Sequence, residues 1–269
     1  MSALPDLAPL AWVVLGIAAC IVGFSKTALP GANTVSIAIF AAILPAKQST
    51  GALLLLLIVG DAFAVWAYRK HASWPTMLRL APAVVAGLVL GAVFLAFADD
   101  DWVRRVIGAI LLLVVAFTMW RRYFSLGRGM TASRGSADGA APPTGAGSTT
   151  GRGLAGSIGY GSLAGFTTMV ANAGGPVMSM YFLAMKFPVQ AFLGTAAWFF
   201  AIINIAKLPF SISLGLIDAS SLALDLVLVP GVVIGAVLGR WIAMRIKQRV
   251  FERAVLAVTI LAALYLVIF

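Results

Sequence analysis

The sequence has very few of the residues that build disulfides, metal centres or a charged surface. It contains one cysteine, Cys20, and one histidine, His71, which excludes an internal disulfide and a multi-histidine metal centre, so no cofactor is expected. Charged residues make up 10% of the chain, against about 25% in ordinary soluble domains. Apolar residues make up 62%, more than a soluble fold of 269 residues can bury. The composition therefore predicts an integral membrane protein.

The few charges are unbalanced, with 19 Lys and Arg against 9 Asp and Glu. In a soluble protein such an excess would suggest a nucleic-acid partner. In a membrane protein basic residues collect in cytoplasmic loops instead. We therefore expect membrane lipid, and no nucleic acid, around this chain.

Ten apolar runs follow one another along the chain, and they lack the period-2 alternation of strands, so the predicted class is all-α. Most reach the roughly 20 residues that a helix needs to cross a bilayer. Those at 33–44 and 176–186 are shorter. The runs cover residues 8–24, 33–44, 50–68, 80–98, 106–120, 153–172, 176–186, 189–208, 222–240 and 252–269.

Each short run follows a glycine-rich break. The first break reads GFSKTALPGAN at 23–33 and the second reads GFTTMVANAGGP at 165–176. We expect interrupted or short helices at 23–45 and 165–186, which either cross the bilayer in pairs or form re-entrant hairpins.

A low-complexity segment at 121–152, rich in Gly, Ser, Thr, Ala and Pro, divides the runs into two sets. It has nothing apolar to bury and is predicted to be a flexible linker. The predicted organisation is a first transmembrane repeat at 1–120, this linker, and a second transmembrane repeat at 153–269.

Five landmarks recur in the same order in both sets, at offsets of 142 to 148 residues. The matched pairs are Gly23 and Gly165, Pro45 and Pro188, Gly51 and Gly194, Pro82 and Pro230, and Arg105 and Arg253. This order indicates an internal duplication.

The two copies are expected to insert in opposite orientations, because each carries an odd number of runs. With both termini outside and the linker cytoplasmic, 14 of the 19 basic residues fall on the cytoplasmic side, as the positive-inside rule requires. This arrangement places Lys47 and Lys207 at the outer side. The prediction is a multi-pass protein of the inner (cytoplasmic) membrane, built from two inverted-topology repeats of about five segments each. Inverted repeats with interrupted helices are typical of secondary transporters.

The polar residues of the two breaks are hydroxyls, amides and one ammonium, without a carboxylate. Unpaired backbone N–H groups at the start of a half-helix, together with its positive dipole end, favour anions. The breaks therefore predict a binding site for a small oxyanion. Its expected residues are Ser25, Lys26, Thr27, Asn33, Thr167, Thr168 and Asn172.

Two charged residues in this region each have two interpretations. A lysine in hydrocarbon costs about 2.5–3.5 kcal/mol, so Lys26 either faces a polar cavity or extends to the cytoplasmic interface. Asp61, deep in run 50–68, is a proton-coupling site or a partner of Lys26, or else a neutral acid in a helix–helix hydrogen bond. Its counterpart Asn204 cannot titrate, so the two are also a candidate polar packing pair. Asp225, near the start of run 222–240, is expected at the interface.

The GFSKTALPG segment at 23–31, the pair Gly60–Asp61, YRKHASW at 68–74 and the P-x4-G-x3-G helices resemble the TauE/SafE family, the sulfite exporter family of membrane permeases. The resemblance covers both halves and omits 121–152. It implies a secondary carrier for small anions such as sulfite or short organosulfonates, generally working as an exporter. A basic position of the family maps to Lys26, whereas the second break has threonines in place of a lysine.

Together these features predict a secondary transporter that moves a small oxyanion across the membrane by alternating access, with export and proton coupling as the expected mode. Its partner would be a small anionic substrate. One alternative is a passive anion channel on the same scaffold, and another is a membrane assembly factor that transports nothing. An enzyme is not expected, because the chain has no GxSxG or HExxH motif and no histidine in an apolar run. The oligomeric state is not indicated.

Overall fold

A computed structural model describes residues 7–103, 105–107, 109–110, 113, 149–247, 250 and 253. Regular structure in these ranges is helical, as predicted. The α-helices are α1 Pro9–Thr27, α2 Asn33–Ile43, α3 Ala46–Tyr68, α4 Trp74–Phe97, α6 Thr149–Ala171, α7 Gly174–Ala184, α8 Val189–Ser213 and α9 Ala219–Ala243, and two 3₁₀ helices are η1 Pro30–Ala32 and η2 Arg69–His71. Most of the predicted linker and most of the runs 106–120 and 252–269 lie outside the described residues. The last residues of the predicted linker are helical, since α6 begins at Thr149.

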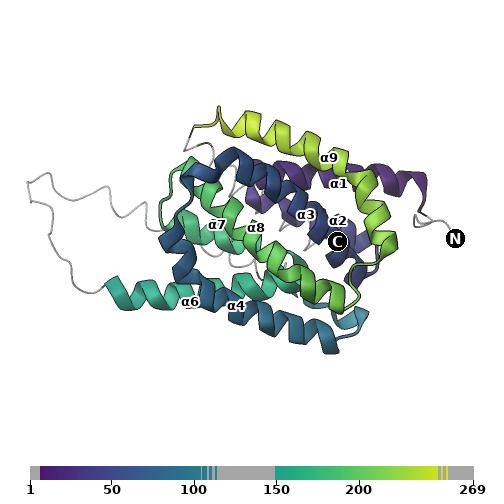
Figure 1. The fold of residues 1–269 in the computed structure, drawn as a ribbon, viewed down its shortest axis with the longest axis horizontal. Coiled ribbons are helices and arrows are strands. Elements are labelled where there is room, and N and C mark those ends of the chain that lie inside the picture. The colour runs from purple at the N-terminus through teal and green to yellow at the C-terminus, as the bar shows by residue number, and fades with distance from the viewer. Residues whose placement is uncertain are drawn as a thin grey trace, which may run out of the picture.

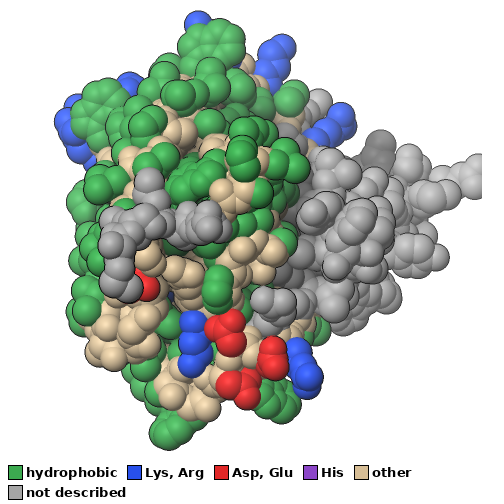
Figure 2. Space-filling model, turned by 90° about the vertical axis from the view of Figure 1, so that its right-hand side faces the viewer, with side chains coloured by type: hydrophobic (Ala, Val, Ile, Leu, Met, Phe, Trp, Pro, Cys, Tyr) green, Lys and Arg blue, Asp and Glu red, His purple; other side chains and the backbone are tan. Residues whose placement is uncertain are grey.

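Five of the described helices are long and apolar enough to cross a membrane. They are Pro9–Thr27, Ala46–His71, Trp74–Phe97, Val189–Ser213 and Ala219–Ala243. Large apolar side chains point outward from them; Phe97 is 88% exposed and Leu226 is 75% exposed. Figure 2 shows such side chains over much of one face, with the charged side chains gathered in a few places. An apolar exterior of this extent fits contact with lipid.

The two short helices are the return arms of helical hairpins. Each has 11 residues and is therefore about 16 Å long, half of the roughly 30 Å hydrocarbon layer. In the first hairpin α2 folds back on α1, and Ser36 Oγ donates to the Ala18 carbonyl at 2.9 Å. In the second hairpin α7 folds back on α6, where the rings of Tyr160 and Tyr181 lie 5.7 Å apart. The short helices expected at 23–45 and 165–186 are thus present.

Glycines let two pairs of helices pack backbone to backbone. On α1 and α9, a Cβ at Gly23 or Gly235 would collide with a carbonyl oxygen of the other helix, and the same holds for Gly87 of α4 and Gly165 of α6. The opposing carbonyls belong to Val232, Cys20, Ser162 and Val84 respectively. Cys20 and Ser162 stand 142 residues apart and Val84 and Val232 stand 148 apart, so the two packings use positions matched by the repeat offsets. Small residues at such contacts are typical of helix association in membranes.

These contacts interlock the two halves of the sequence. Figure 1 shows α1 beside α9 along one side of the molecule and α4 beside α6 along the opposite side, with α3 and α8 between them. In the same view α1 and α6 run in opposite directions, as do α4 and α9. The first helix of each half therefore packs against the fourth described helix of the other half.

Candidate functional site

The tips of the two hairpins meet in the middle of the molecule. Asn33, at the start of α2, donates through Nδ2 to the Asn172 carbonyl at 3.4 Å. Asn172, between α6 and α7, donates through its own Nδ2 to the Thr50 carbonyl of α3 at 2.9 Å. The two glycine-rich breaks are therefore in contact although 139 residues separate these two asparagines.

The local sequence explains the shape of both tips. Pro30 has no N–H to leave unpaired and begins the short η1 turn after α1 ends. Ser25 Oγ donates to the Pro30 carbonyl and accepts from the Asn33 N–H, both at 3.1 Å, which ties the end of α1 to the start of α2. In the second tip Asn172 has a φ of 53°, in the left-handed region that asparagine tolerates better than most residues.

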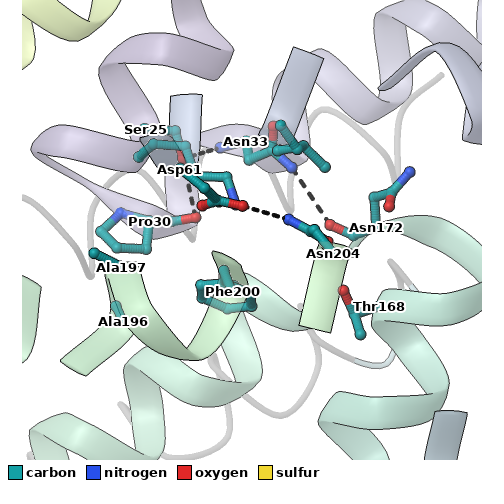
Figure 3. A pocket seen from close by; sticks show the side chains of 13 residues that line it. Ser25, Pro30, Asn33, Asp61, Thr168, Asn172, Ala196, Ala197, Phe200 and Asn204 are labelled. Atoms are coloured by element: carbon teal, nitrogen blue, oxygen red, sulfur yellow. Dashed lines mark hydrogen bonds and ion pairs between the residues drawn. The ribbon is translucent and has the colours of Figure 1, made fainter. Parts of the chain in front are cut away.

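A small polar cavity lies between the tips and the middle of α3 and α8 (Figure 3). Its lining residues are Ser25, Lys26, Pro30, Asn33, Leu57, Asp61, Thr168, Asn172, Gly175, Ala196, Ala197, Phe200 and Asn204. The space open to the centre of a water-sized molecule measures about 20 Å³, which is enough for about one water. The cavity is therefore small and unites residues of both halves.

Lys26 and Asp61 form a buried ion pair in this cavity. Lys26 Nζ lies 2.7 Å from Asp61 Oδ1, and their side chains are 9% and 2% exposed. Asn204 Nδ2 donates to the other carboxylate oxygen at 2.6 Å, as Figure 3 shows. The Lys26 ammonium also lies 4.7 Å from the centre of the Phe200 ring, within the range of a cation–π contact. Of the two interpretations of Lys26, the structure favours the one in which it faces a polar cavity.

A second buried lysine, which the sequence analysis placed at the outer side, lies directly behind the cavity wall. Lys207 is 1% exposed, and its Nζ donates to the Thr168 carbonyl and to Asn172 Oδ1, both at 2.5 Å. The earlier placement is wrong because α8 continues through Pro209 to Ser213 instead of ending near Lys207. One signal was available, since Phe200, Asn204 and Lys207 follow the i, i+4, i+7 spacing of a single helix face.

Two threonines predicted for the site use their hydroxyl groups elsewhere. Thr27 Oγ1 donates to the Ala236 carbonyl of α9 at 2.9 Å. Thr167 Oγ1 donates to the Leu163 carbonyl of its own helix at 2.8 Å. Neither residue lines the cavity, whereas the other predicted residues, Ser25, Lys26, Asn33, Asp61, Thr168, Asn172 and Asn204, do.

The charges around the cavity do not balance. When all three groups are ionised, the ammonium groups of Lys26 and Lys207 face the single carboxylate of Asp61, and no further charged side chain lines the cavity among the described residues. The helices α2 and α7 also begin there, with Asn33 and Gly175 in the lining, and they add the positive ends of two helix dipoles. With all three groups ionised, the site therefore carries one uncompensated positive charge away from bulk water, which favours the binding of an anion.

A family model described as sulfite exporter TauE/SafE matches residues 15–266 of the chain. The match includes every residue that lines the cavity and both hairpins from residue 15 onward. Comparison with curated proteins and comparison with solved structures give no match.

Proposed function

Because this chain belongs to the sulfite exporter TauE/SafE family, and so to a family of multi-pass membrane transporters, we propose that it is a secondary carrier for a small sulfur oxyanion or short organosulfonate. It exports this anion across the cytoplasmic membrane by alternating access. The observation that carries the proposal is the pair of buried lysines, Lys26 and Lys207, around a cavity with one carboxylate.

The substrate anion takes the uncompensated charge of this cavity. Lys26 is the lining cation, and Asn33 and Asn172 lie in the same wall. Lys207 acts from behind, because it holds the Asn172 side chain and the Thr168 carbonyl in place. A tetrahedral or pyramidal oxyanion accepts hydrogen bonds in several directions, which suits donors that arrive from two hairpins and two long helices.

The small cavity fits an occluded state of the carrier. A space for about one water is too small for a sulfur oxyanion, so the hairpin tips have to separate for the substrate to enter. Two inverted repeats, at 1–120 and 153–269, provide equivalent movements toward either side of the membrane. The opposite directions of α1 and α6 and the matched glycine packings support this arrangement. In the proposed topology both termini are outside and the linker at 121–152 is cytoplasmic.

A panel of substrates tests the proposal. The purified protein is reconstituted in liposomes, and uptake of sulfite, sulfoacetate, thiosulfate, phosphate and acetate is measured with and without a pH gradient. We expect saturable uptake of sulfite or sulfoacetate, competition between the two, and weaker uptake of acetate. Equal indifference to all five anions would refute the transport of oxyanions.

The same vesicles separate the carrier from a channel and from an assembly factor. A carrier exchanges labelled for unlabelled substrate and saturates, whereas a passive channel gives a current that rises in proportion to voltage. A protein that transports nothing would give neither signal while still being folded in detergent.

A further inference from the structure

Asp225 is a buried carboxyl group that the anion site does not use. It lies six residues after the start of α9, on the same buried face as Leu228 and Val232, and it is 4% exposed. Neither of its carboxyl oxygens has a hydrogen-bond partner among the described residues. Its position near the start of run 222–240 predicts the membrane interface, so its burial is a finding of the structure.

The neighbouring stretch of α3 offers Asp225 no charge. The register of α3 against α9 follows from two contacts: Gln48 Nε2 donates to Ser220 Oγ at 3.1 Å, and a Cβ at Gly60 would lie 3.7 Å from Val232 Cγ1. Asp225 falls between these contacts and faces the stretch 49–59, STGALLLLLIV, which contains no ionisable residue. The ionisable side chains of α3, which are Lys47, Asp61 and Tyr68, lie beyond the two ends of this stretch.

The neighbouring stretch of α1 is equally apolar. A Cβ at Gly231 would lie 3.1 Å from the Gly16 carbonyl, so Asp225 faces the residues before Gly16. These residues, PLAWVVL at 9–15, contain no ionisable side chain, while Cys20 and Lys26 follow later in the helix. On α9 itself the nearest ionisable group is Asp218, seven residues before Asp225 at the start of the helix.

The matching position in the other half holds an apolar residue. The shared P-x4-G-x3-G spacing of α4 and α9 aligns Met77 with Asp225, and Met77 is 7% exposed. The packing at the matching level of the first half therefore accommodates a neutral side chain. An unpaired carboxylate ion in such a place is strongly disfavoured, whereas the neutral acid avoids most of that cost by keeping its proton.

We propose that Asp225 is a proton-binding site of the carrier, loaded with a proton in the occluded conformation and emptied when α9 separates from α1 and α3. On release its O–H bond breaks, a water molecule accepts the proton, and the carboxylate stays hydrated until it is reprotonated from the other side. Val232, which lies beside Gly60 and so next to Asp61, is seven residues or about 10 Å further along α9. Asp225 thus lies between the outer end of α9 and the ion pair of the anion site. The coupling of this proton to transport rests on the proposed function, but the presence of the proton does not.

Infrared spectroscopy tests the proton directly. A protonated carboxyl group gives a C=O band that a carboxylate lacks. We expect the wild-type protein at neutral pH to show this band and Asp225→Asn to lose it, while Asp218→Asn, the same change in an exposed carboxyl on the same helix, keeps it. An identical band in wild type and Asp225→Asn would overturn the proposal. This result does not depend on transport, so it stands even where no anion of the panel is taken up.

Transport of sulfite in the same liposomes tests the coupling. In Asp225→Asn we expect sulfite exchange without a gradient to stay within about twofold of the wild-type rate, since the amide mimics the neutral acid. Stimulation of uptake by a pH gradient should disappear in this variant and persist in Asp218→Asn. Gradient stimulation equal to that of the wild type would overturn the coupling role. Loss of both sulfite exchange and gradient stimulation would also overturn it, because Asp225 would then be needed to move the anion itself.

Discussion

Replacing Lys207 by methionine removes one of the two buried positive charges without changing the length of the side chain much. The ammonium lies behind Asn172 and Thr168, which themselves line the cavity. An anion in the cavity would be one hydrogen-bonded group away from Nζ, at roughly 6 Å. With an effective dielectric constant of about 20, the attraction between two unit charges at that distance is 332/(20 × 6), or about 3 kcal/mol.

We therefore expect Lys207→Met to raise the KM for sulfite uptake by about 100-fold, because each 1.4 kcal/mol corresponds to a factor of about ten in affinity. The measurement is the initial rate of uptake into liposomes against sulfite concentration. Lys70→Met, the same change at an exposed position in η2, serves as the control and should leave KM unchanged. Thermal unfolding in detergent verifies that both variants are folded. A KM for Lys207→Met within about threefold of the wild type would refute the assignment of Lys207 to the charge of the site.

Three further predictions concern stability, each measured by unfolding of the purified protein in detergent. Asp61→Asn leaves Lys26 without its carboxylate and should lower the free energy of unfolding by about 3–5 kcal/mol. Adding Lys26→Met to this variant should recover most of that loss. Additive losses from the two changes would argue against a buried pair. Gly235→Ala places a methyl group against an α1 carbonyl and should cost about 1–3 kcal/mol, whereas Gly16→Ala, which meets open space, should be neutral or slightly stabilising; equal effects would contradict the close packing. Asp218→Ala removes the N-cap of α9 and should cost about 0.5–2 kcal/mol. Backbone N–H donation lowers the pKa of Asp218, so its contribution is complete above the ordinary aspartate pKa and disappears as the pH falls through the lowered value; a variant deficit that persists in stronger acid would exclude this cause.

The all-helical class and the two short helices were predictable, because run length and composition determine both, whereas the choice between hairpins and paired crossings stayed open. An 11-residue apolar helix cannot span a bilayer on its own, and the glycine-rich break before it has to turn the chain. The convergence of the breaks on one cavity also followed from the idea of two related halves. Most of the predicted linker and most of the final run lie outside the described residues, so those parts stay predictions.

The sequence did not show which polar residues near the breaks line the cavity and which bond elsewhere. Thr27 and Thr168 are both polar residues near the ends of their helices, yet only Thr168 lines the cavity, since Thr27 faces α9. Lys207 was missed because the predicted run ended at 208, whereas α8 continues through Pro209, and membrane helices tolerate an internal proline. Burial of Asp225 depends on the close approach of α1 and α3, which hydropathy along one segment does not report.

Because α1 packs against a helix of the other half, the order of synthesis determines when this contact can form. Thr27 of α1 bonds to Ala236 of α9, which the ribosome adds 209 residues later. At about 5–20 residues per second, the face of α1 that carries Gly23 therefore stays uncovered for about 10–40 s, until α9 has been synthesised. During that interval lipid or the insertion machinery has to shield this face. A truncated chain that stops before α9 would retain its uncovered surface, which makes it a natural target for membrane quality control.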